Sequence, residues 1–504
     1  MNTKLKDISE LKKILKIKNK KSVLCHGVFD LLHIGHIYYL EEAKKNGEIL
    51  IVSLTSNKFV NKGPSRPVFD ELQRAKMLAA LNFVDFVVIS NNPTAEVILK
   101  ELKPNVYCKG PDFKDSKKDL TGKIINETKL VKKYGGKVVF TKSETFSSSN
   151  LINKFYSKQS ISHKKNINQI KKNVGLEKVL NSIDKLKKLK VLVVGELIID
   201  EYVFCEAIGK SGKEPVMVLK YMNEEQYLGG SSAIARHLSS FNKQITLLTM
   251  LGEKKQFLNK IKKEIPKNVN LKFIKKNNSP TILKKRIIDK LNNSKLLGVY
   301  SMNDETLDNK NESQFIKLLK SEIPKHDLTI VTDYGHGFIT DKAAKIILKL
   351  SKFLAVNAQI NAMSLGTHSM RKYKNLSCLT INEKELRYEL RQKGKDLNYL
   401  IKKLSNDQKI QNLVVTRGKT GAILYNLKKK KFFHNEAYSK NAVDKIGAGD
   451  ALLALVSIFL KNKMDERLSL MLASIAASQV TDMVGNKESI NKSNLLKTFE
   501  HFLK

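Results

Sequence analysis

Residues 27–36 read GVFDLLHIGH and decide the fold class of the first part of the chain. They follow an apolar run at residues 22–25, which predicts a buried strand, and they precede a helix-like stretch at residues 37–45. The string therefore predicts a strand, a turn and a helix, with His33 and His36 on one helix face. A helix N-terminus presents unpaired N–H groups and the positive end of its dipole, so this turn favours an anion.

The two histidines give this turn a chemical function. Imidazoles beside a helix start can donate hydrogen bonds to a phosphate whose charge shifts during transfer. A lone histidine would be interpreted as a satisfied core residue, but His33 and His36 stand in a complete pattern directly after a predicted strand. The pattern therefore predicts a site for phosphate chemistry.

Strand-like and helix-like segments alternate on both sides of a polar stretch. In the first half, strands are expected at residues 49–54, 86–89, 106–108 and 137–140, with helices at 72–81 and 95–102. In the second half, buried strands are expected at residues 191–194, 328–332, 379–381 and 413–416, and a small antiparallel flap from residues 216–221 and 281–288. Such alternation predicts α/β folds with parallel sheets covered by helices on both faces.

The domain boundaries follow from composition. The segment from about residue 153 to 188 is rich in Lys, Asn and Ser, which predicts a helical, mostly solvated linker. We expect two doubly wound domains, at residues 1–155 and 188–504, joined by a linker at 156–187. A chain of 504 residues with 41% hydrophobic residues suits two such cores.

A second string, DKIGAGD at residues 444–450, precedes the apolar run at 451–460, which predicts a buried helix. The two glycines of the Gly447-Ala448-Gly449 turn let backbone N–H groups close around an anion. Asp450 at the helix start is expected to stay ionised and to accept the proton of an attacking hydroxyl. Alone, GxGD would be interpreted as a loop with a capping aspartate, but further motifs nearby favour a site.

The apolar runs and the cysteines indicate the cellular compartment. No segment approaches the roughly 18 to 20 consecutive apolar residues that cross a bilayer, and the N-terminus lacks the apolar stretch of a secretory signal. Cys25, Cys108, Cys205 and Cys378 lie far apart without CxxC spacing, which suits a reducing cytoplasm and predicts neither a disulfide framework nor a zinc site.

The net charge of +42 raises nucleic-acid binding as one hypothesis. The lysines are spread through both halves, however, and dispersed charge is usually a solvated surface. We therefore expect no membrane and no specific nucleic-acid partner, but a field that attracts anionic small molecules.

The first half resembles the cytidylyltransferase-like family of nucleotidyltransferases over about residues 20–155. The resemblance rests on the histidine string and on Arg66-Pro67, Gln73-Arg74, the KGPD of residues 109–112 and the serines of 147–149. The HIGH tetrad also occurs in class I aminoacyl-tRNA synthetases, but the unit is short and lacks a recognisable KMSKS-type loop.

The resemblance implies a role for each matching residue. His33 and His36 would stabilise the transition state at the α-phosphate, and Lys109 would neutralise phosphate charge. The nucleotide would be bound by Gly27, Phe29, Asp30, Ser147, Ser148 and Ser149. The implied reaction is transfer of a nucleotidyl group from an NTP to a sugar or polyol phosphate, with Mg²⁺ and release of pyrophosphate. The choice between ATP and CTP stays open.

From about residue 188 onward the chain resembles the ribokinase (PfkB) family of sugar kinases. The matching motifs are Gly229-Gly230 before a helix, the NEKE of residues 382–385 and the TRGKTG of residues 416–421, together with the DKIGAGD string. The family implies ATP-dependent phosphorylation of a sugar hydroxyl, and by analogy a homodimer formed through the kinase half.

In that family the matching residues divide into three groups. Asp450 would be the catalytic base beside an anion hole formed by Gly447, Ala448 and Gly449. Asp200, Gly229, Gly230 and Asn382 would bind the sugar, while Glu385 would organise Mg²⁺ with Asn382. Thr416, Gly418 and Gly421 would lie beside ATP.

Residues 214–216 (EPV) and 333–335 (DYG) further resemble the bifunctional heptose kinase/nucleotidyltransferase family, in which the kinase half usually comes first. The resemblance implies an enzyme that makes an activated heptose for lipopolysaccharide or another surface glycan. Ala233, Glu196 and the VNAQ of residues 356–359 depart from the kinase pattern on the acceptor side. The alternative is thus an active nucleotidyltransferase with a degenerate kinase half that binds or regulates.

Overall fold

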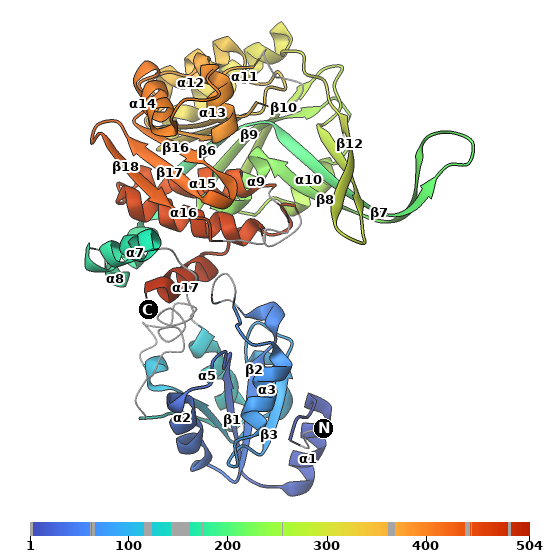
Figure 1. The fold of residues 1–504 in the computed structure, drawn as a ribbon, viewed down its shortest axis with the longest axis vertical. Helices are drawn as coiled ribbons and strands as arrows, with labels where there is room; N and C mark the ends of the chain where they lie inside the picture. The colour runs from blue at the N-terminus through green and yellow to red at the C-terminus, as the bar shows by residue number, and fades with distance from the viewer. Residues whose placement is uncertain are drawn as a thin grey trace. The chain divides into compact units, whose positions relative to one another are not determined.

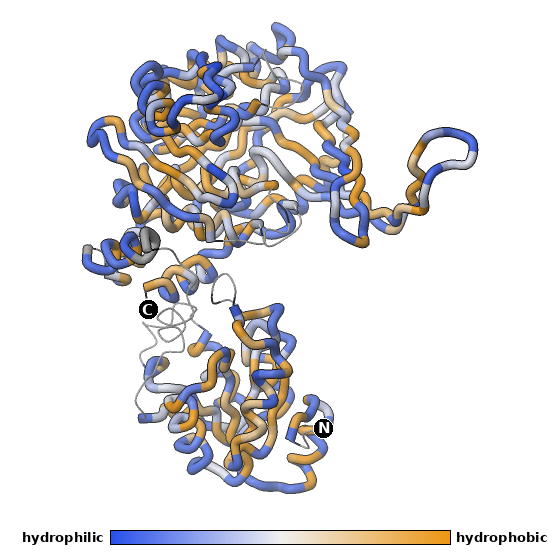
Figure 2. Tube along the Cα trace, viewed as in Figure 1, coloured by the Kyte–Doolittle hydropathy of each residue, from blue (hydrophilic) through white to orange (hydrophobic). Residues whose placement is uncertain are grey.

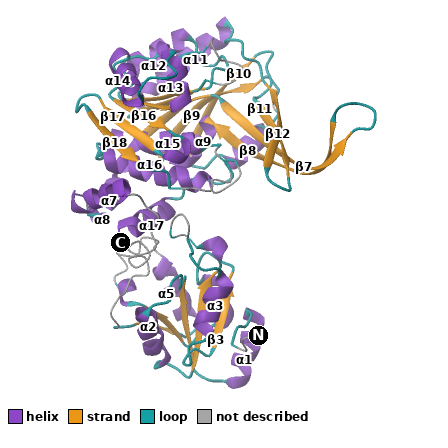
Figure 3. Cartoon of the chain, viewed as in Figure 1, coloured by secondary structure: helices purple, strands orange, loops and turns teal. Residues whose placement is uncertain are grey.

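The computed structural model describes residues 4–60, 62, 66–114, 123–142, 161–173, 175–254, 256–360, 368–438, 444, 446–481 and 485–503. The chain forms two compact units, one of residues 1–164 with 496–504 and one of residues 165–495. Both are layered α/β structures, with strands between helices (Figure 3). None of the described helices is long and apolar enough to cross a membrane.

The first unit holds a five-stranded sheet in the order β3-β2-β1-β4-β5, in which every neighbouring pair is parallel. Its strands are β1 (Ser22–Gly27), β2 (Ile49–Thr55), β3 (Phe86–Ser90), β4 (Val106–Lys109) and β5 (Lys137–Phe140). Its helices are α1 (Ile8–Lys18), α2 (Ile34–Lys44), α3 (Glu71–Ala79), α4 (Glu96–Leu102) and α5 (Lys123–Lys133). The strands expected in this half are confirmed, since β2 to β5 lie where they were expected. Every residue of β2 is buried, as expected for a central strand of a parallel sheet.

Two buried clusters, one on each face of this sheet, hold the first unit together. Leu40 of α2 and Leu78 of α3 pack with Val23 and Val52 on one face. Leu99 of α4 belongs to the cluster on the other face. The doubly wound arrangement expected from the sequence is therefore confirmed.

The second unit holds a nine-stranded sheet in the order β10-β9-β6-β13-β14-β15-β16-β17-β18. Its strands are β6 (Lys190–Gly195), β9 (Gln244–Gly252), β10 (Val269–Lys276), β13 (Leu328–Asp333), β14 (Leu354–Ala358), β15 (Cys378–Asn382), β16 (Asn412–Thr416), β17 (Ala422–Asn426) and β18 (Lys431–Asn435). The sheet is parallel from β10 to β16, and β17 and β18 add an antiparallel edge. The short turn after β16 explains this edge, since a parallel crossover needs a longer connection.

Helices cover both faces of this sheet (Figure 1). One face carries α11 (Asn309–Glu322), α12 (Asp341–Leu350), α13 (Glu383–Leu390) and α14 (Leu397–Asp407), and the other carries α9 (Ser231–Leu238), α15 (Ala448–Lys461) and α16 (Glu466–Thr481). The remaining helices of 161–503 are α7 (Ile161–Asn173), α8 (Leu176–Lys185), α10 (Leu258–Glu264) and α17 (Lys492–Leu503). All residues from Ala451 to Leu460 are buried, so the predicted buried helix is confirmed. Figure 2 shows that apolar residues also predominate along the strands of the sheet.

The flap is a separate four-stranded sheet in the order β12-β11-β7-β8. Its strands are β7 (Leu197–Lys210), β8 (Met217–Gly230), β11 (Leu283–Asp289) and β12 (Ser294–Ser301). The expectation of a purely antiparallel flap is wrong in one respect, because β11 pairs with β7 in parallel. The chain passes through β8, α9, β9, α10 and β10 between β7 and β11, and this long connection lets the two strands run in the same direction.

Candidate active sites

The first candidate site lies where the strand order of the first unit reverses, between β1 and β4. In open parallel sheets ligands bind outside the carboxyl ends of the strands at this switch point. His33 and His36 follow β1, and Lys109 is the last residue of β4. The fold therefore brings the carboxyl-end residues of β1 and β4 to the same edge of the sheet.

The two histidines form a stacked pair at the start of α2. His33 is the N-cap residue, and its ring lies 3.9 Å from the ring of His36 between centroids. Phe29, at a φ of 49°, places its ring 5.3 Å from that of His36. Burial, the charge of His33 and the charge of Lys62 lower the pKa of His36 to about 3. Burial also lowers the pKa of His33, so both rings are neutral donors near neutral pH.

Asp30 and two arginines, Arg66 and Arg74, hold the shape of this turn. The buried Asp30 carboxylate accepts hydrogen bonds from Arg66 Nε and, at 2.6 Å, from the Val68 backbone N–H. Arg74 is fully buried and donates to the carbonyls of Val28 at 2.6 Å and Thr55 at 2.9 Å. Asp30 therefore acts on the site by fixing the loop after β1, and Arg74 clamps that loop to β2.

Lys109 is buried beside a carboxylate that sequence reasoning missed. Its Nζ lies 3.4 Å from Glu127 Oε2, and its ammonium lies over the ring of Phe113 at 4.7 Å from the centroid. Tyr107 donates a hydrogen bond of 2.9 Å to the same Glu127 oxygen. Glu127 on α5 thus fixes the ammonium at the end of β4. The expected serine contacts of residues 147–149 lie outside the described residues.

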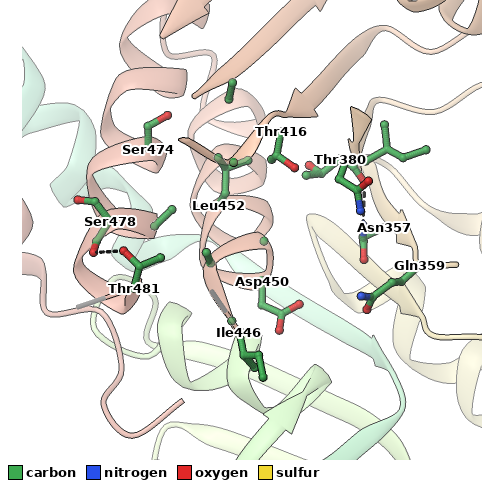
Figure 4. Close-up of a pocket in the computed structure, with 18 of the residues that line it drawn as sticks. Asn357, Gln359, Thr380, Thr416, Ile446, Asp450, Leu452, Ser474, Ser478 and Thr481 are labelled. Atoms are coloured by element: carbon green, nitrogen blue, oxygen red, sulfur yellow. Dashed lines mark hydrogen bonds between the residues drawn. The ribbon is translucent and has the colours of Figure 1, made fainter. Parts of the chain in front are cut away.

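The second candidate site is a cavity of about 570 Å³ at the carboxyl ends of the strands in the second unit. It gathers Asp200, Gly230, Asn382, Glu385, Thr416, Gly418, Gly421, Gly447, Ala448, Gly449 and Asp450. These residues span segments more than 200 positions apart, so the fold brings together motifs that the sequence only predicts one by one. Figure 4 shows Asp450 between the hydroxyl groups of α16 on one side and Asn357 and Gln359 on the other.

The loop before α15 has the geometry of an anion site. Gly447 is the N-cap residue at a φ of 85°, a conformation that favours glycine. Asp450 lies in the first turn of α15 and accepts a hydrogen bond of 2.9 Å from the Tyr334 hydroxyl. Desolvation in the cavity, together with the charge of Asp200, raises the pKa of Asp450 to about 7, against the hydrogen bond from Tyr334. Asp450 therefore takes up and releases a proton near neutral pH, whereas the helix start alone predicts a carboxylate that stays ionised; desolvation in the cavity makes the difference.

Asn382 and Glu385 form a capping box at the start of α13. The Asn382 side chain accepts from the Glu385 backbone N–H at 2.9 Å, and the Asn382 backbone N–H donates to Glu385 Oε2 at 3.0 Å. Burial raises the pKa of Glu385 to about 7. The N-x-x-E pattern thus has a structural function in α13 as well as a place in the cavity wall.

The acceptor side of the cavity is formed by the flap. Arg286 donates to Asp200 Oδ1 at 2.6 Å, and Lys284 lines the cavity from the same strand, β11. Among the described residues, no carboxylate lies within ion-pair distance of Lys284; its ammonium lies 5.6 Å from the ring centroid of Tyr300. Sequence reasoning missed both cations. Their spacing of two residues in an expected strand was the available signal, since it places them on one face.

Gly229 does not line the cavity but lies against Asp200, which does. A Cβ atom at Gly229 would lie 2.1 Å from Asp200 Oδ2, so no larger residue fits without moving that carboxylate. We expect Gly229→Ala to lower the free energy of unfolding of the second unit by about 1–3 kcal/mol, the typical cost of overpacking. Urea unfolding monitors the loss.

Gly212→Ala is the matched control, because a Cβ atom there meets nothing within 4 Å. It should leave the urea midpoint unchanged or raise it slightly. Equal midpoints for Gly229→Ala and the wild type would contradict the close packing of Gly229 against Asp200.

Comparison with known proteins assigns both parts of the chain. The model of the cytidylyltransferase-like family matches residues 24–155, and that of the pfkB family of carbohydrate kinases matches residues 188–493. A protein of Campylobacter jejuni subsp. doylei called bifunctional protein HldE is 48% identical over 130 residues, which are 25% of this chain and 28% of that protein. The protein of the same name from Geobacter metallireducens is 38% identical over 159 residues, 30% of this chain and 31% of its own.

The aligned part of this chain thus spans less than a third of the length of these relatives. Among solved structures, phosphofructokinase-2 from Escherichia coli in complex with potassium covers 63% of this chain and 100% of its own, with a TM-score of 0.52 and 14% identity, which shows a shared fold. The kinase match covers more than half of the 504 residues. The chain therefore belongs to the pfkB family of carbohydrate kinases, a family of transferases, and carries a cytidylyltransferase-like domain ahead of the kinase part.

Proposed function

We propose that this chain is a bifunctional sugar-activating enzyme with two independent transfer sites. The second unit phosphorylates a sugar or sugar phosphate with ATP, and the first unit transfers a nucleotidyl group to a sugar phosphate and releases pyrophosphate. The observation that carries the proposal is the cavity of the second unit, which Asp450 and the Gly447–Gly449 loop line together with Asp200 of the flap. A heptose phosphate is the best single substrate, for a precursor of lipopolysaccharide or another surface glycan.

In the kinase site, the acceptor hydroxyl oxygen attacks the γ-phosphorus of ATP. Asp450 takes the hydroxyl proton, and the bond between the γ-phosphorus and the bridging oxygen breaks to leave ADP. The backbone N–H groups at the start of α15 stabilise the charge on the transferring phosphoryl group. Thr416, Gly418 and Gly421 form the nucleotide side of the cavity, while Asp200 and Asn382 orient the acceptor.

In the nucleotidyltransferase site, a phosphate oxygen of the sugar phosphate attacks the α-phosphorus of the NTP, and pyrophosphate leaves. His33 and His36 donate hydrogen bonds as the charge on the α-phosphate oxygens grows, and Lys109 neutralises the departing phosphates. No nucleophile from the protein is needed, because positioning and charge stabilisation suffice. Gly27 and Phe29 shape the nucleotide pocket, and we assign the triphosphate contacts to Ser147, Ser148 and Ser149.

Magnesium fits the kinase site as an ion carried by the nucleotide. The described residues contain no group of three or more His, Cys, Asp or Glu side chains that could hold a metal by themselves. Mg²⁺ commonly binds through one or two carboxylates together with substrate phosphates, and Glu385 offers such a carboxylate in the cavity. Bound there, the ion would neutralise phosphate charge.

The charge of the flap favours a phosphorylated acceptor. Burial lowers the pKa of Lys284, more than the nearby charge of Asp200 raises it, which indicates a cation taken out of water. A partly buried ammonium that lines a cavity is stabilised when an anionic group enters it. We therefore propose a sugar phosphate as the acceptor of the kinase site.

We also propose the cytoplasm as the compartment of this enzyme and, by analogy with the kinase family, a homodimer formed through the kinase half.

The degenerate-kinase alternative rests on the altered acceptor residues. Glu196 is fully buried and accepts hydrogen bonds from the backbone N–H groups of Tyr334 and His336, at 3.1 and 3.2 Å. It therefore supports the loop after β13 and leaves acceptor binding to Asp200. Formation of ADP with a panel of hexose and heptose phosphates tests the point. Turnover of one of them supports the kinase, and no turnover with any acceptor favours the alternative.

The pKa of Asp450 predicts how kinase activity depends on pH. A general base works in its ionised form, so kcat/KM, which reports the pKa values of the free enzyme, should fall as pH decreases through about 7. At pH 6 we expect a rate about tenfold below the plateau above pH 8. A stopped ADP assay between pH 5.5 and 9 measures the profile.

Pyrophosphate release provides the internal comparison for this profile. The pKa of His36 is lowered to about 3, so the nucleotidyl transfer should show no inflection from this residue near pH 7. A kinase rate that stays constant between pH 6 and 8 would contradict the role of Asp450 as base.

A further inference from the structure

Asp444, a buried carboxylate at the entrance to the phosphate-transfer loop, receives four hydrogen bonds. Its Oδ1 accepts from Lys295 Nζ at 2.7 Å and from the Ile446 backbone N–H at 3.2 Å. Its Oδ2 accepts from the Tyr202 hydroxyl at 3.0 Å and from the Gly485 backbone N–H at 3.1 Å. Only 5% of Asp444 is exposed, so this carboxylate depends on these donors.

The four donors come from separate parts of the second unit. Tyr202 lies on β7 and Lys295 on β12, which are both strands of the flap. Ile446 belongs to the loop that leads into α15, and Gly485 lies beyond the end of α16. One side chain therefore connects the flap, the phosphate-transfer loop and a neighbouring loop.

The same flap strands carry the acceptor side of the cavity. Asp200 and Tyr202 are two residues apart on β7, so they share a face of the strand. Lys284 and Arg286 lie on β11, which pairs with both β7 and β12. Any movement of the flap therefore shifts the acceptor side of the cavity and the donors of Asp444 together.

Charge makes Lys295 the decisive donor. Burial raises the pKa of Asp444, but the hydrogen bond and charge of Lys295, with the backbone donors of Ile446 and Gly485, outweigh it and lower the pKa overall. Without the ammonium, a buried negative charge would stand beside the loop that must bind phosphate. The packing is also close, because a Cβ atom at Gly485 would lie 2.9 Å from Tyr202 Cε2.

We propose that Tyr202 and Lys295 latch the flap onto Asp444, and that this latch holds the phosphate-transfer loop in its anion-binding shape. When the flap is released, Asp444 loses two of its four donors and the loop at Ile446 loses its support. Tyr202 and Lys295 are positioning residues, since they act through Asp444. The use of the latch in catalysis rests on the proposed kinase function, whereas the coupling between flap and loop does not.

Hydrogen–deuterium exchange on the full chain with MgADP tests the coupling directly. Lys295→Ala should speed exchange about tenfold both in the flap segment 283–301 and in the loop and helix start at 446–452, because a hydrogen bond to a charged group is lost. Lys285→Ala is the matched control. Lys285 also lies on the flap, its side chain is 40% exposed against 42% for Lys295, and it pairs with Glu201 instead.

Restoring the charge should restore the loop. Lys295→Arg should retain protection in both segments, and ethylammonium chloride should slow exchange at 446–452 in Lys295→Ala where choline chloride at equal concentration does not. Tyr202→Phe, which removes only the hydroxyl, should speed exchange in the loop in the same direction. Faster exchange confined to the flap in Lys295→Ala, or the same loop effect in Lys285→Ala, would overturn the latch. Neither outcome depends on whether the chain phosphorylates a sugar, so it separates the latch from the proposed function.

Discussion

Asp450→Asn is expected to reduce sugar phosphorylation by about 10²- to 10⁴-fold, the contribution of a positioned general base. Asparagine keeps the shape of the side chain and a hydrogen bond to Tyr334, which lies 2.9 Å from Asp450 Oδ1, but it cannot take the hydroxyl proton. Release of pyrophosphate by the first unit should continue at the wild-type rate. Both rates are measured on one preparation, with ADP and pyrophosphate as the products followed.

Asp465→Asn is the control for this variant. Asp465 accepts from the Leu468 backbone N–H at 3.1 Å near the start of α16, so it is also an aspartate at a helix start but does not line the cavity. It should leave the kinase rate unchanged. A kinase rate that survives Asp450→Asn would remove Asp450 from the proposed mechanism.

His36→Ala is expected to reduce pyrophosphate release by about 10²- to 10³-fold, the typical loss on removing one donor that stabilises transition-state charge. The buried Nδ1 of His36 has no hydrogen-bond partner among the described residues, which suits a side chain that awaits a ligand. Phosphorylation of the sugar should remain, because the described residues that line the kinase cavity all belong to the second unit.

His26→Gln is the matched control for His36→Ala. His26 lies at the end of β1, burial lowers its pKa to about 3 as well, and its Nδ1 is within 3.0 Å of Ser53 Oγ. Its hydrogen bonds are thus made inside the protein, so glutamine should preserve the nucleotidyl transfer. Equal losses for the two histidine variants would indicate damage to the fold, and circular dichroism separates that case.

Local patterns carry the parts of this molecule that the sequence predicts. The strands β1, β2 and β5 match the expected segments within two residues, because each is a short apolar run bounded by turn residues. The motif loops are also local, since a glycine-rich turn and a helix start are encoded within a few residues. Asp450 therefore falls in the first turn of α15 as expected.

Contacts across long stretches of chain were beyond the sequence patterns. Glu127 pairs with Lys109 from the helix between β4 and β5, and Lys295 meets Asp444 across 149 positions. Arginine is usually a surface residue, yet Arg74 is buried in the first unit, where its guanidinium donates four hydrogen bonds. Such partners depend on topology, which a single sequence does not reveal.

The most direct test of two independent transfer sites is ³¹P nuclear magnetic resonance of wild type, His36→Ala and Asp450→Asn. Each is incubated with Mg²⁺ and either ATP or CTP, together with heptose 1-phosphate and a panel of sugar phosphates. The account predicts pyrophosphate and an NDP-sugar that disappear only in His36→Ala, and ADP with a newly phosphorylated sugar that disappear only in Asp450→Asn. A single variant that abolishes both sets of products while the protein stays folded, or a wild type that forms neither, would contradict it.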